Sequence, residues 1–308
     1  MPRVRLRQIA LVGQNIDYSK NTLCAMFDTY VAFRDPGIVP SFGGMFNILL
    51  QFGDCFLEVV SPTDEGYGVN STSAKLLKKS NGDCGYMAIL QVDDVAHTSQ
   101  KLAAGGGRMV LGSGQVIKGE VGEGSAKGVK GFRVKVGDSL PKDKGTVSMI
   151  NLQWHPKDYG TLMETEEQWP AHRGAEGSWL PAGNGWQNDY KRRSSAVCEE
   201  FAGIEIALKG GKSACEAMAK KWSDGLEVPL LQDGRIGVQL TGSTVEFIEA
   251  GSDGVTGIVV ISVYAAPGRP KAFLGEVKFH GIRWKLVDRN GQYNTQPKYE
   301  TMLGASKM

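Results

Sequence analysis

The sequence predicts an α+β fold built from repeated strand–helix–strand modules. An internal repeat carries this prediction: a strand-like segment followed by a helix-like segment at residues 8–30 returns at residues 205–222. Glycine accounts for 41 of the 308 residues, nearly twice the usual share of about 7%, which indicates many short elements separated by turns. Hydrophobic residues make up 41% of the chain, enough to bury a core and to rule out wholesale disorder.

The first module begins with a strand around Gln8, Ile9, Ala10 and Leu11. Because its apolar stretch is only a few residues long, this start favours a strand over a signal peptide. A helix is predicted over residues 21–30. Two strand-like runs at 47–52 and 55–60 follow, and the Gly53-Asp54 pair between them is a hairpin signal.

Three further modules follow the same order. In the second, a strand at 85–92 leads to Asp93-Asp94, which can cap a helix over 95–104. The second module continues with strands at 132–136, 147–153 and 161–165. The third is predicted to have a strand at 205–208, a helix at 213–222 and strands at 236–240 and 244–248. The fourth is predicted to have a strand at 257–263, a short helical piece at 270–274 and a hairpin formed by 276–279 and 282–287.

This order predicts two halves, each made of two modules. The first half spans residues 5–166 and the second, degenerate half spans 198–290. Residues 167–197 are predicted to be a connector with three tryptophans, and 291–308 a disordered tail. Residues 112–130 are rich in Gly, Lys and Glu and predict an exposed loop or lid.

Composition excludes several classes of protein. A net charge of +2 predicts no attraction to nucleic acid or anionic lipid. No apolar run approaches the roughly 20 residues that span a bilayer. The five cysteines are odd in number and scattered, which argues against a disulfide framework and a zinc site. We therefore expect a reducing, cytoplasmic location.

Four motifs give the chain a resemblance to a known family. They are QIALV at 8–12, FLEVVSP at 56–62, GYMAILQVDDV at 85–95 and HPKDYGTLME at 155–164. With them the sequence resembles the vicinal oxygen chelate superfamily, which includes glyoxalases, bleomycin-resistance proteins and dioxygenases. The last motif is similar to the closing segment of methylmalonyl-CoA epimerase. The resemblance implies βαβββ modules that form cupped mixed sheets around a cavity, the glyoxalase-like fold.

The resemblance also implies a ligand set at Gln8, Glu58, Met87 and Glu164. The first and third of these positions are commonly His in the family, so a zinc or iron site and an extradiol dioxygenase site are both disfavoured. An amide oxygen with two carboxylates, from Gln8, Glu58 and Glu164, suits Mn²⁺ or Mg²⁺ completed by water. We therefore expect a divalent metal, if one binds, to be one of these two.

Glu58 and Glu164 are the candidate catalytic residues. Each is a lone carboxylate in an apolar strand, where burial is costly unless a partner, a shared proton or a cation is present. As a pair they could perform general acid and base work at a carbon next to a carbonyl. The alternative is that either side chain faces solvent at a sheet edge.

Gln8, Met87 and His155 are candidate substrate-binding residues. Gln8 could orient a substrate oxygen or bond a neighbouring strand, and Met87 could simply fill the core. His155 could contact ligand at the cavity mouth or satisfy a turn. In the second half, Glu205 and Glu246 occupy the repeat positions of Gln8 and approximately Glu58, but no further ligand type follows at 257–260. The second half is therefore predicted to be structural.

Two functions remain open from the sequence. One is a glyoxalase-like enzyme, an isomerase or lyase, that acts on a small carbonyl or hydroxy-acid type substrate through the carboxylate pair. The other is a non-catalytic protein that binds or sequesters a small molecule, as bleomycin-resistance proteins do. Either reading predicts a small-molecule ligand, no nucleic acid and no membrane. A monomer and a homodimer are both compatible with the sequence.

Overall fold

The computed structural model describes most of the chain. The described residues are 3–35, 44–68, 71–110, 148–169, 194–267 and 275–290, together with 116, 124–125, 133–134 and 179. The predicted lid at 112–130, the helical piece at 270–274 and the tail at 291–308 lie mostly or wholly outside these residues, as does most of the connector. Among the described residues, no helix combines the length and apolar character needed to cross a membrane.

The chain divides into two compact units, and each contains segments from both ends of the sequence. Unit 1 comprises Met1–Arg7, Met87–Leu180 and Ile206–Gly257, and unit 2 comprises Gln8–Tyr86, Pro181–Glu205 and Ile258–Met308. The two halves predicted in sequence order, 5–166 and 198–290, stay a prediction.

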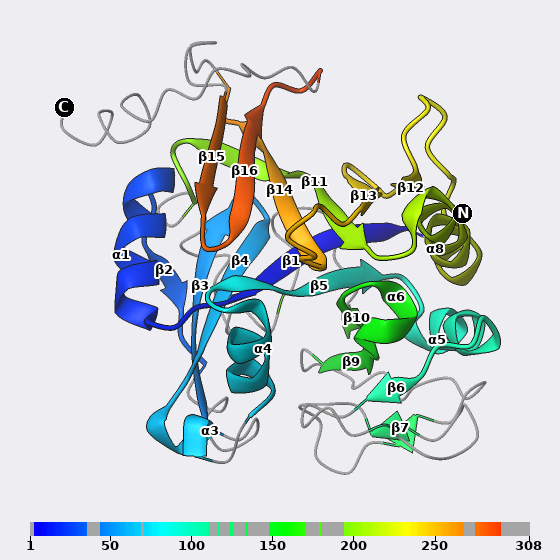
Figure 1. Ribbon diagram of the computed structural model, residues 1–308, viewed down its shortest axis with the longest axis horizontal. Helices are drawn as coiled ribbons and strands as arrows, with labels where there is room; N and C mark the ends of the chain where they lie inside the picture. Colours follow the sequence, from blue (N-terminus) through cyan, green and yellow to red (C-terminus); the bar gives the residue numbers. More distant parts are fainter. Residues whose placement is uncertain are drawn as a thin grey trace. The chain divides into compact units, whose positions relative to one another are not determined.

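Unit 2 contains the first module of the repeat. Its strands lie in the order β2, β3, β4, β1 (Figure 1), with β1 parallel to β4 and β3 antiparallel to β4. Gly53 and Asp54 form the predicted hairpin turn between β3 and β4. The bounds are β1 Val4–Val12, α1 Ile16–Phe27, β2 Val31–Phe33, β3 Met45–Phe52, β4 Cys55–Pro62, α3 Asp64–Gly68 and α4 Thr72–Ser80.

The last module completes unit 2. Strands β14 (Gly257–Ala265), β16 (Ile282–Val287) and β15 (Gly275–Phe279) are neighbours in that order, with β11 (Cys198–Leu208) next to β14. Helix α1 packs against β3 and β4, and the Phe27 ring lies 4.8 Å from that of Phe52 and 5.1 Å from that of Trp284. These aromatic contacts place the last module against the first.

The turn between β15 and β16 is held by a contact between buried His280 and partly exposed Asp83. His280 and Gly281 both have positive φ, +54° and +67°, as a two-residue hairpin turn requires. The buried His280 Nδ1 lies 2.5 Å from Asp83 Oδ2, and Asp83 Oδ1 accepts a hydrogen bond from the Gln14 N–H at 2.7 Å. Asp83 therefore joins three segments of unit 2.

Unit 1 contains the second and third modules. Its strands β5, β10, β9 and β6 are neighbours in that order, with β10 parallel to β5 and antiparallel to β9. Strands β12, β13 and the end of β11 form the other sheet segment. The remaining bounds are β5 Cys84–Val92, α5 Val95–Ala104, β6 Met109–Val110, β7 Gly124–Ser125, β8 Arg133–Val134, β9 Ser148–Trp154, α6 Pro156–Tyr159, β10 Leu162–Trp169, α8 Gly211–Leu226, β12 Gly237–Gln239 and β13 Thr244–Glu249.

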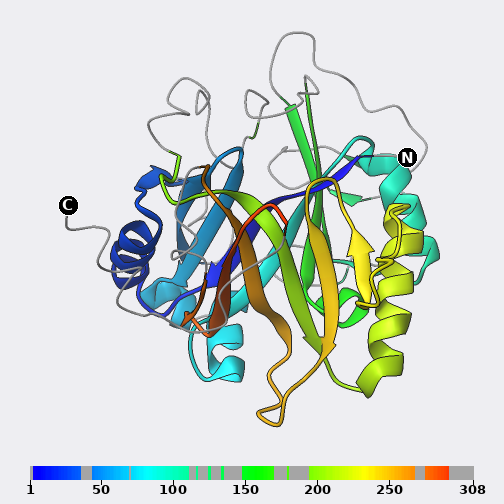
Figure 2. The same ribbon diagram turned by 90° about the horizontal axis from the view of Figure 1, so that it is seen from above.

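Helices α5 and α8 lie side by side in unit 1 (Figure 2), joined by Glu227, which pairs with His97 and Lys101. A series of buried rings fills the core beneath them. Tyr159 contacts Trp154 at 6.1 Å and Trp222 at 6.4 Å between ring centroids, and Trp222 contacts Phe247 at 5.6 Å. Burial of such aromatic surface is the main stabilising contribution to a core of this kind.

The predicted α+β class and the mixed sheets are confirmed. The helix predicted over 95–104 is α5, and the Asp94 side chain caps it by accepting from the His97 N–H. The helix predicted over 21–30 is wrong in its bounds, because Asn15 caps α1 and the chain leaves it at Asp28, where φ is +45°. Helix α4, which follows its cap Ser71, has no counterpart in the prediction.

Candidate functional site

Glu58 is held in unit 2 by two side-chain amides. It lies on β4 and is 7% exposed. Gln8 Nε2 donates to Glu58 Oε2 at 3.0 Å, and Asn47 Nδ2 donates to Glu58 Oε1 at 2.8 Å. Asn47 uses its other end too, because its Oδ1 accepts from the Asp35 N–H at 2.9 Å. The buried carboxylate thus receives hydrogen bonds on both oxygens, which offsets the cost of its desolvation.

Glu164 has the corresponding arrangement in unit 1. It lies on β10 and is 5% exposed. Gln153 Nε2 donates to Glu164 Oε2 at 2.6 Å, and Asn151 Nδ2 donates to Glu164 Oε1 at 3.2 Å. Gln153 Nε2 also lies 3.8 Å from Met87 Sδ. Neutral amides therefore surround this carboxylate, and it forms no ion pair within the described residues.

Strand register shows which donors correspond in the two repeats. Glu58 is opposite Leu49 across β3–β4, and Glu164 is opposite Gln153 across β9–β10. Asn47 and Asn151 each lie two residues before those positions, on the same face of the sheet. The two asparagines are therefore equivalent, whereas the second donor differs.

The second donor comes from opposite sides of the carboxylate in the two repeats. In unit 2 it is Gln8, from the parallel neighbour β1. In unit 1 the position equivalent to Gln8 holds Met87, a thioether without a proton to give, and Gln153 on the antiparallel neighbour β9 donates instead.

Sequence reasoning identified the carboxylates but missed Asn47, Asn151 and Gln153. The signal was present as polar residues two apart in otherwise apolar strands, such as Asn151-Leu152-Gln153. Alternation along a strand places such residues on one face, together with a carboxylate on the neighbouring strand. Substrate contact by Gln8, Met87 and His155 stays a prediction.

The donor set does not fit a divalent cation in the arrangement described. In unit 1 the N–H groups of Asn151 and Gln153 take one lone pair on each oxygen of Glu164, and in unit 2 Gln8 turns its N–H group, not a lone pair, toward Glu58. Within the described part of the chain, no three or more His, Cys, Asp or Glu side chains gather as a metal site requires. The set can instead orient the carboxyl group of Glu164, whose two oxygens have about four lone-pair sites and use two of them on these donors.

Comparison with known proteins gives the fold. No family model matches the sequence, and no curated protein matches it. A triple mutant of 4-hydroxymandelate synthase from Streptomyces coelicolor is similar in structure, with a TM-score of 0.56 and 13% identity over 86% of this chain and 71% of that chain. The chain has a glyoxalase-like fold.

Two other solved structures are similar to this glyoxalase-like chain. A hypothetical protein from Staphylococcus aureus has a TM-score of 0.54 and 12% identity over 92% of this chain and 99% of that one. Methylmalonyl-CoA epimerase from Mycobacterium tuberculosis has a TM-score of 0.37 and 20% identity over 54% of this chain and 88% of that chain.

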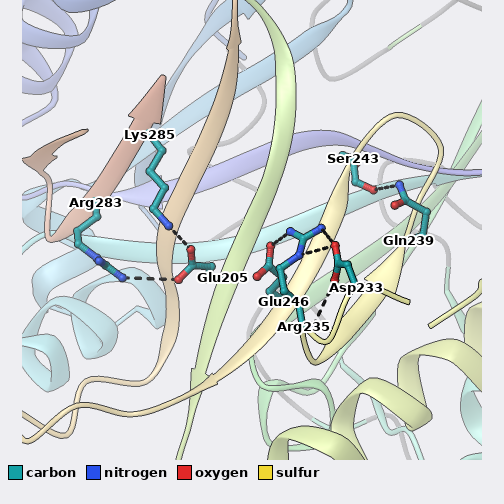
Figure 3. Close-up of polar contacts among 8 residues, drawn as sticks. All are labelled: Glu205, Asp233, Arg235, Gln239, Ser243, Glu246, Arg283 and Lys285. Carbon is teal, nitrogen blue, oxygen red and sulfur yellow. Dashed lines mark hydrogen bonds and ion pairs between the residues drawn. The ribbon is translucent and has the colours of Figure 1, made fainter. Parts of the chain in front are cut away.

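In the later modules of this glyoxalase-like fold, the repeated carboxylates form ion pairs. In unit 2, Glu205 Oε1 lies 2.5 Å from Lys285 Nζ and its Oε2 lies 3.5 Å from Arg283 Nη2 (Figure 3). In unit 1, Glu246 Oε1 lies 2.5 Å from Arg235 Nη1. The side-chain donors described above for Glu58 and Glu164 are neutral amides. The contrast singles out the amide-bound carboxylates of the first two modules.

His155 occupies the start of α6 in unit 1. Its Nδ1 accepts a hydrogen bond from the Lys157 N–H at 3.1 Å, and Pro156 fixes the first turn. Burial, followed by the positive charge of Arg108, lowers the pKa of His155. Arg108 itself forms a two-pronged pair with Asp158, at 2.9 and 2.7 Å. The histidine is therefore a helix cap in the described structure.

Proposed function

We propose that the chain is a glyoxalase-like enzyme that moves a proton on a small carbonyl or hydroxy-acid type substrate, with Glu58 and Glu164 as its acid and base. The observation that supports this most is Glu164: a buried carboxylate, bound on both oxygens by neutral amides, with no cation paired to it among the described residues. A carboxylate in this setting is fixed in place and still has lone pairs to accept a proton.

The proposed step needs no oxidant. An oxygen of Glu164 takes the proton from a carbon next to the substrate carbonyl, and the electron pair of that C–H bond moves into an enolate. A carboxylic acid then returns a proton, to the opposite face of the same carbon or to the neighbouring carbon, so that an isomer forms. If the enolate instead expels a leaving group from the adjacent carbon, the same step gives lyase chemistry.

The amides have a separate part in this step. Asn151 and Gln153 fix the orientation of Glu164, and Asn47 and Gln8 do the same for Glu58. Because the hydrogen bonds exist before any substrate arrives, no reorganisation is required when the proton moves. Substrate orientation by Gln8 and ligand contact by Met87 and His155 belong to the same proposal.

Solvent exchange tests the proposal. In D₂O, hydroxyacetone and lactate incubated with the protein should exchange the hydrogen next to the carbonyl or carboxylate faster than in buffer, as followed by proton NMR. Glu164→Gln should lower this rate about 10²- to 10⁴-fold, the usual contribution of a general base. Glu216→Gln, on the exposed face of α8 beside Lys212, is the matched control and should keep the wild-type rate. Equal rates for wild type and Glu164→Gln would contradict the proposal.

Mn²⁺ or Mg²⁺ remains an alternative that metal analysis decides. The protein is purified without chelator and its metal content is compared with that of Glu58→Ala. Stoichiometric metal that disappears in the variant would show that the amides move aside to admit a cation. If the wild type contains no metal and still catalyses deuterium exchange of the probes, the carboxylates act without a metal ion.

The second candidate function is a non-catalytic small-molecule binder. It is favoured by Met87, a side chain without acid or base chemistry, at a position where the family commonly carries His. A binder would bind hydroxyacetone and lactate without any deuterium exchange, both in the wild type and in Glu164→Gln. In both cases the ligand is a small molecule, and the cytoplasmic location and the choice between monomer and homodimer stay predictions from the sequence.

A further inference from the structure

We propose that Asn151 is a ligand-binding residue whose Oδ1 accepts a hydrogen bond from a hydroxyl or ammonium group of the substrate beside Glu164. This inference rests on the proposed function, because it places the substrate at the same carboxylate. It goes further in assigning a role to Asn151 and in naming the chemical group that the ligand must carry.

The first support is an unused acceptor. Asn151 is 8% exposed, and its Nδ2 donates to Glu164 Oε1 at 3.2 Å. Its Oδ1 is buried and has no hydrogen-bond partner among the residues that the structure describes. Because a buried carbonyl without a donor is unfavourable, native proteins rarely keep one unless something else binds there.

The equivalent residue in the other repeat provides the comparison. Asn47 binds Glu58 through its Nδ2 in the same way, but its Oδ1 accepts from the Asp35 N–H at 2.9 Å. Both ends of Asn47 are therefore used by the protein itself. The two asparagines share a strand position and one hydrogen bond, and only Asn151 has an acceptor left for a ligand.

The orientation of the Asn151 amide follows from its neighbours. If the amide were turned over, Oδ1 would face Glu164 Oε1 at 3.2 Å, two acceptors in contact. Glu166, opposite Asn151 across the strand pair, is a further acceptor, but turning the NH₂ group toward it would take the donor away from Glu164 Oε1. The Nδ2 group therefore stays on Glu164, and Oδ1 stays unused.

The surroundings select the ligand chemistry. Glu164, Glu166 and Met87 lie on the same face of the sheet as Asn151 and present hydrogen-bond acceptors, while Gln153 donates to Glu164 and Arg7 donates to Gln91, opposite Glu166. A ligand group that binds Asn151 Oδ1 itself must donate. A hydroxyl or an ammonium group fits, whereas a carboxylate or phosphate oxygen against Oδ1 would place two acceptors in contact.

Three matched probes test the inference by binding alone. Hydroxyacetone carries the hydroxyl, methoxyacetone has it blocked by a methyl group, and aminoacetone carries an ammonium group. Dissociation constants are measured by titration in NMR, together with the shift of the Asn151 side-chain NH₂ signal. Loss of one hydrogen bond corresponds to about a five- to tenfold weaker affinity. We expect the wild type to prefer hydroxyacetone or aminoacetone over methoxyacetone by about this factor.

The variants test whether the ratio depends on Asn151. Asn151→Leu keeps the side-chain shape without the acceptor and should bring the ratio between the donor probe and methoxyacetone to about one. Glu216→Gln, on the exposed face of α8, is the control and should keep the wild-type ratio. If Asn151→Leu fails to fold, Asn151→Ala serves in its place.

Each result bears on the proposal. Equal affinity of the wild type for the donor probes and methoxyacetone would overturn the proposal, and this is the result expected if only a buried water binds Oδ1. An affinity ratio that is unchanged in Asn151→Leu would overturn it too. If the ratio survives while Glu164→Gln abolishes deuterium exchange, this inference fails and the proposed function stands. If the ratio collapses but the wild type exchanges no deuterium, the binding role stands and the proton transfer fails.

Discussion

Asp83 connects the loop after β1, the segment before β5 and the turn of the last hairpin in unit 2. Burial alone would raise the pKa of Asp83, but its pairing with His280 and its hydrogen bond from the Gln14 N–H outweigh burial and lower the pKa. A carboxylate with a lowered pKa in the folded state contributes stability that is present above its unfolded value, near about 4, and is lost as the pH falls through the folded value.

Asp83→Asn should therefore weaken the acid sensitivity of the fold. At neutral pH we expect a loss of about 1 kcal/mol in the free energy of unfolding, because one charged hydrogen-bond acceptor is removed. Between pH 5 and pH 2.5 the variant should lose less stability than the wild type, since its side chain no longer titrates. Urea unfolding at a series of pH values measures this, and parallel curves for the two proteins would rule out the assigned role of Asp83.

At the residue scale, part of the candidate site was predictable. Glu58 lies between Leu57 and Val59, and Glu164 follows Met163. A Glu beside apolar residues in a strand predicts a buried carboxylate with a partner, and both carboxylates are buried and hydrogen-bonded. Their partners were not predictable, because which amide reaches a carboxylate depends on strand register. Register is set by pairing between segments far apart in sequence, such as Gln8 with Phe56.

Several helices in this chain begin where a side chain accepts a hydrogen bond from a backbone N–H of the first turn. Helix α5 could be predicted to the residue, because Asp94 caps it and Gly105 follows it. Helix α1 could not, since its cap Asn15 lies in a run of polar residues that offers several possible starts. Turn glycines also carry information, but the sequence does not show which of them another segment approaches.

Two hairpin glycines allow the energetic cost of a left-handed backbone conformation to be compared with the cost of a close steric contact. Gly242, between β12 and β13, has φ +82° and open space at its Cβ position, whereas a Cβ on Gly281, with φ +67°, would lie 2.3 Å from the Asp83 carbonyl oxygen. Gly242→Ala should cost about 1–2 kcal/mol for the left-handed conformation alone. Gly281→Ala should cost at least about 1 kcal/mol more, because the backbone of residue 83 must move. Chemical denaturation compares the two, and equal losses would contradict the close approach.

At the scale of the whole molecule, each compact unit draws on both halves of the sequence. The sequence revealed four similar modules, but similarity does not specify which modules pack together. Unit 2 takes Trp284 from the last module to cover Phe27 of the first, and unit 1 takes Trp222 from the third to cover Tyr159 of the second. The pairing is decided by these side-chain contacts, which only the folded chain brings together.

A fragment of residues 1–197 tests this arrangement. It lacks α8 and β14–β16, so the aromatic faces around Tyr159 and Phe27 would be exposed. We expect the fragment to bind a hydrophobic dye and to melt without a sharp transition, whereas a control fragment of residues 1–290 should melt as the full chain does. Cooperative melting of the shorter fragment within a few degrees of the full chain would favour the division into sequential halves at 166 and 198.

The exchange of hydrogen-bond donors between the two amide-bound carboxylates has a consequence for how such chains diverge. One repeat uses Gln8 with Leu49 opposite the carboxylate, and the other uses Gln153 with Met87 at the first position. Loss of the donor at the first position alone leaves a carboxylate oxygen without a hydrogen bond, and gain of a donor opposite the carboxylate alone adds a side chain that has no oxygen to bind. When both changes occur together, the number of hydrogen bonds to the carboxylate stays the same. Related chains should therefore vary at these two positions in a correlated way. A signature that fixes the donor at one position would then overlook relatives that have moved it across the strand.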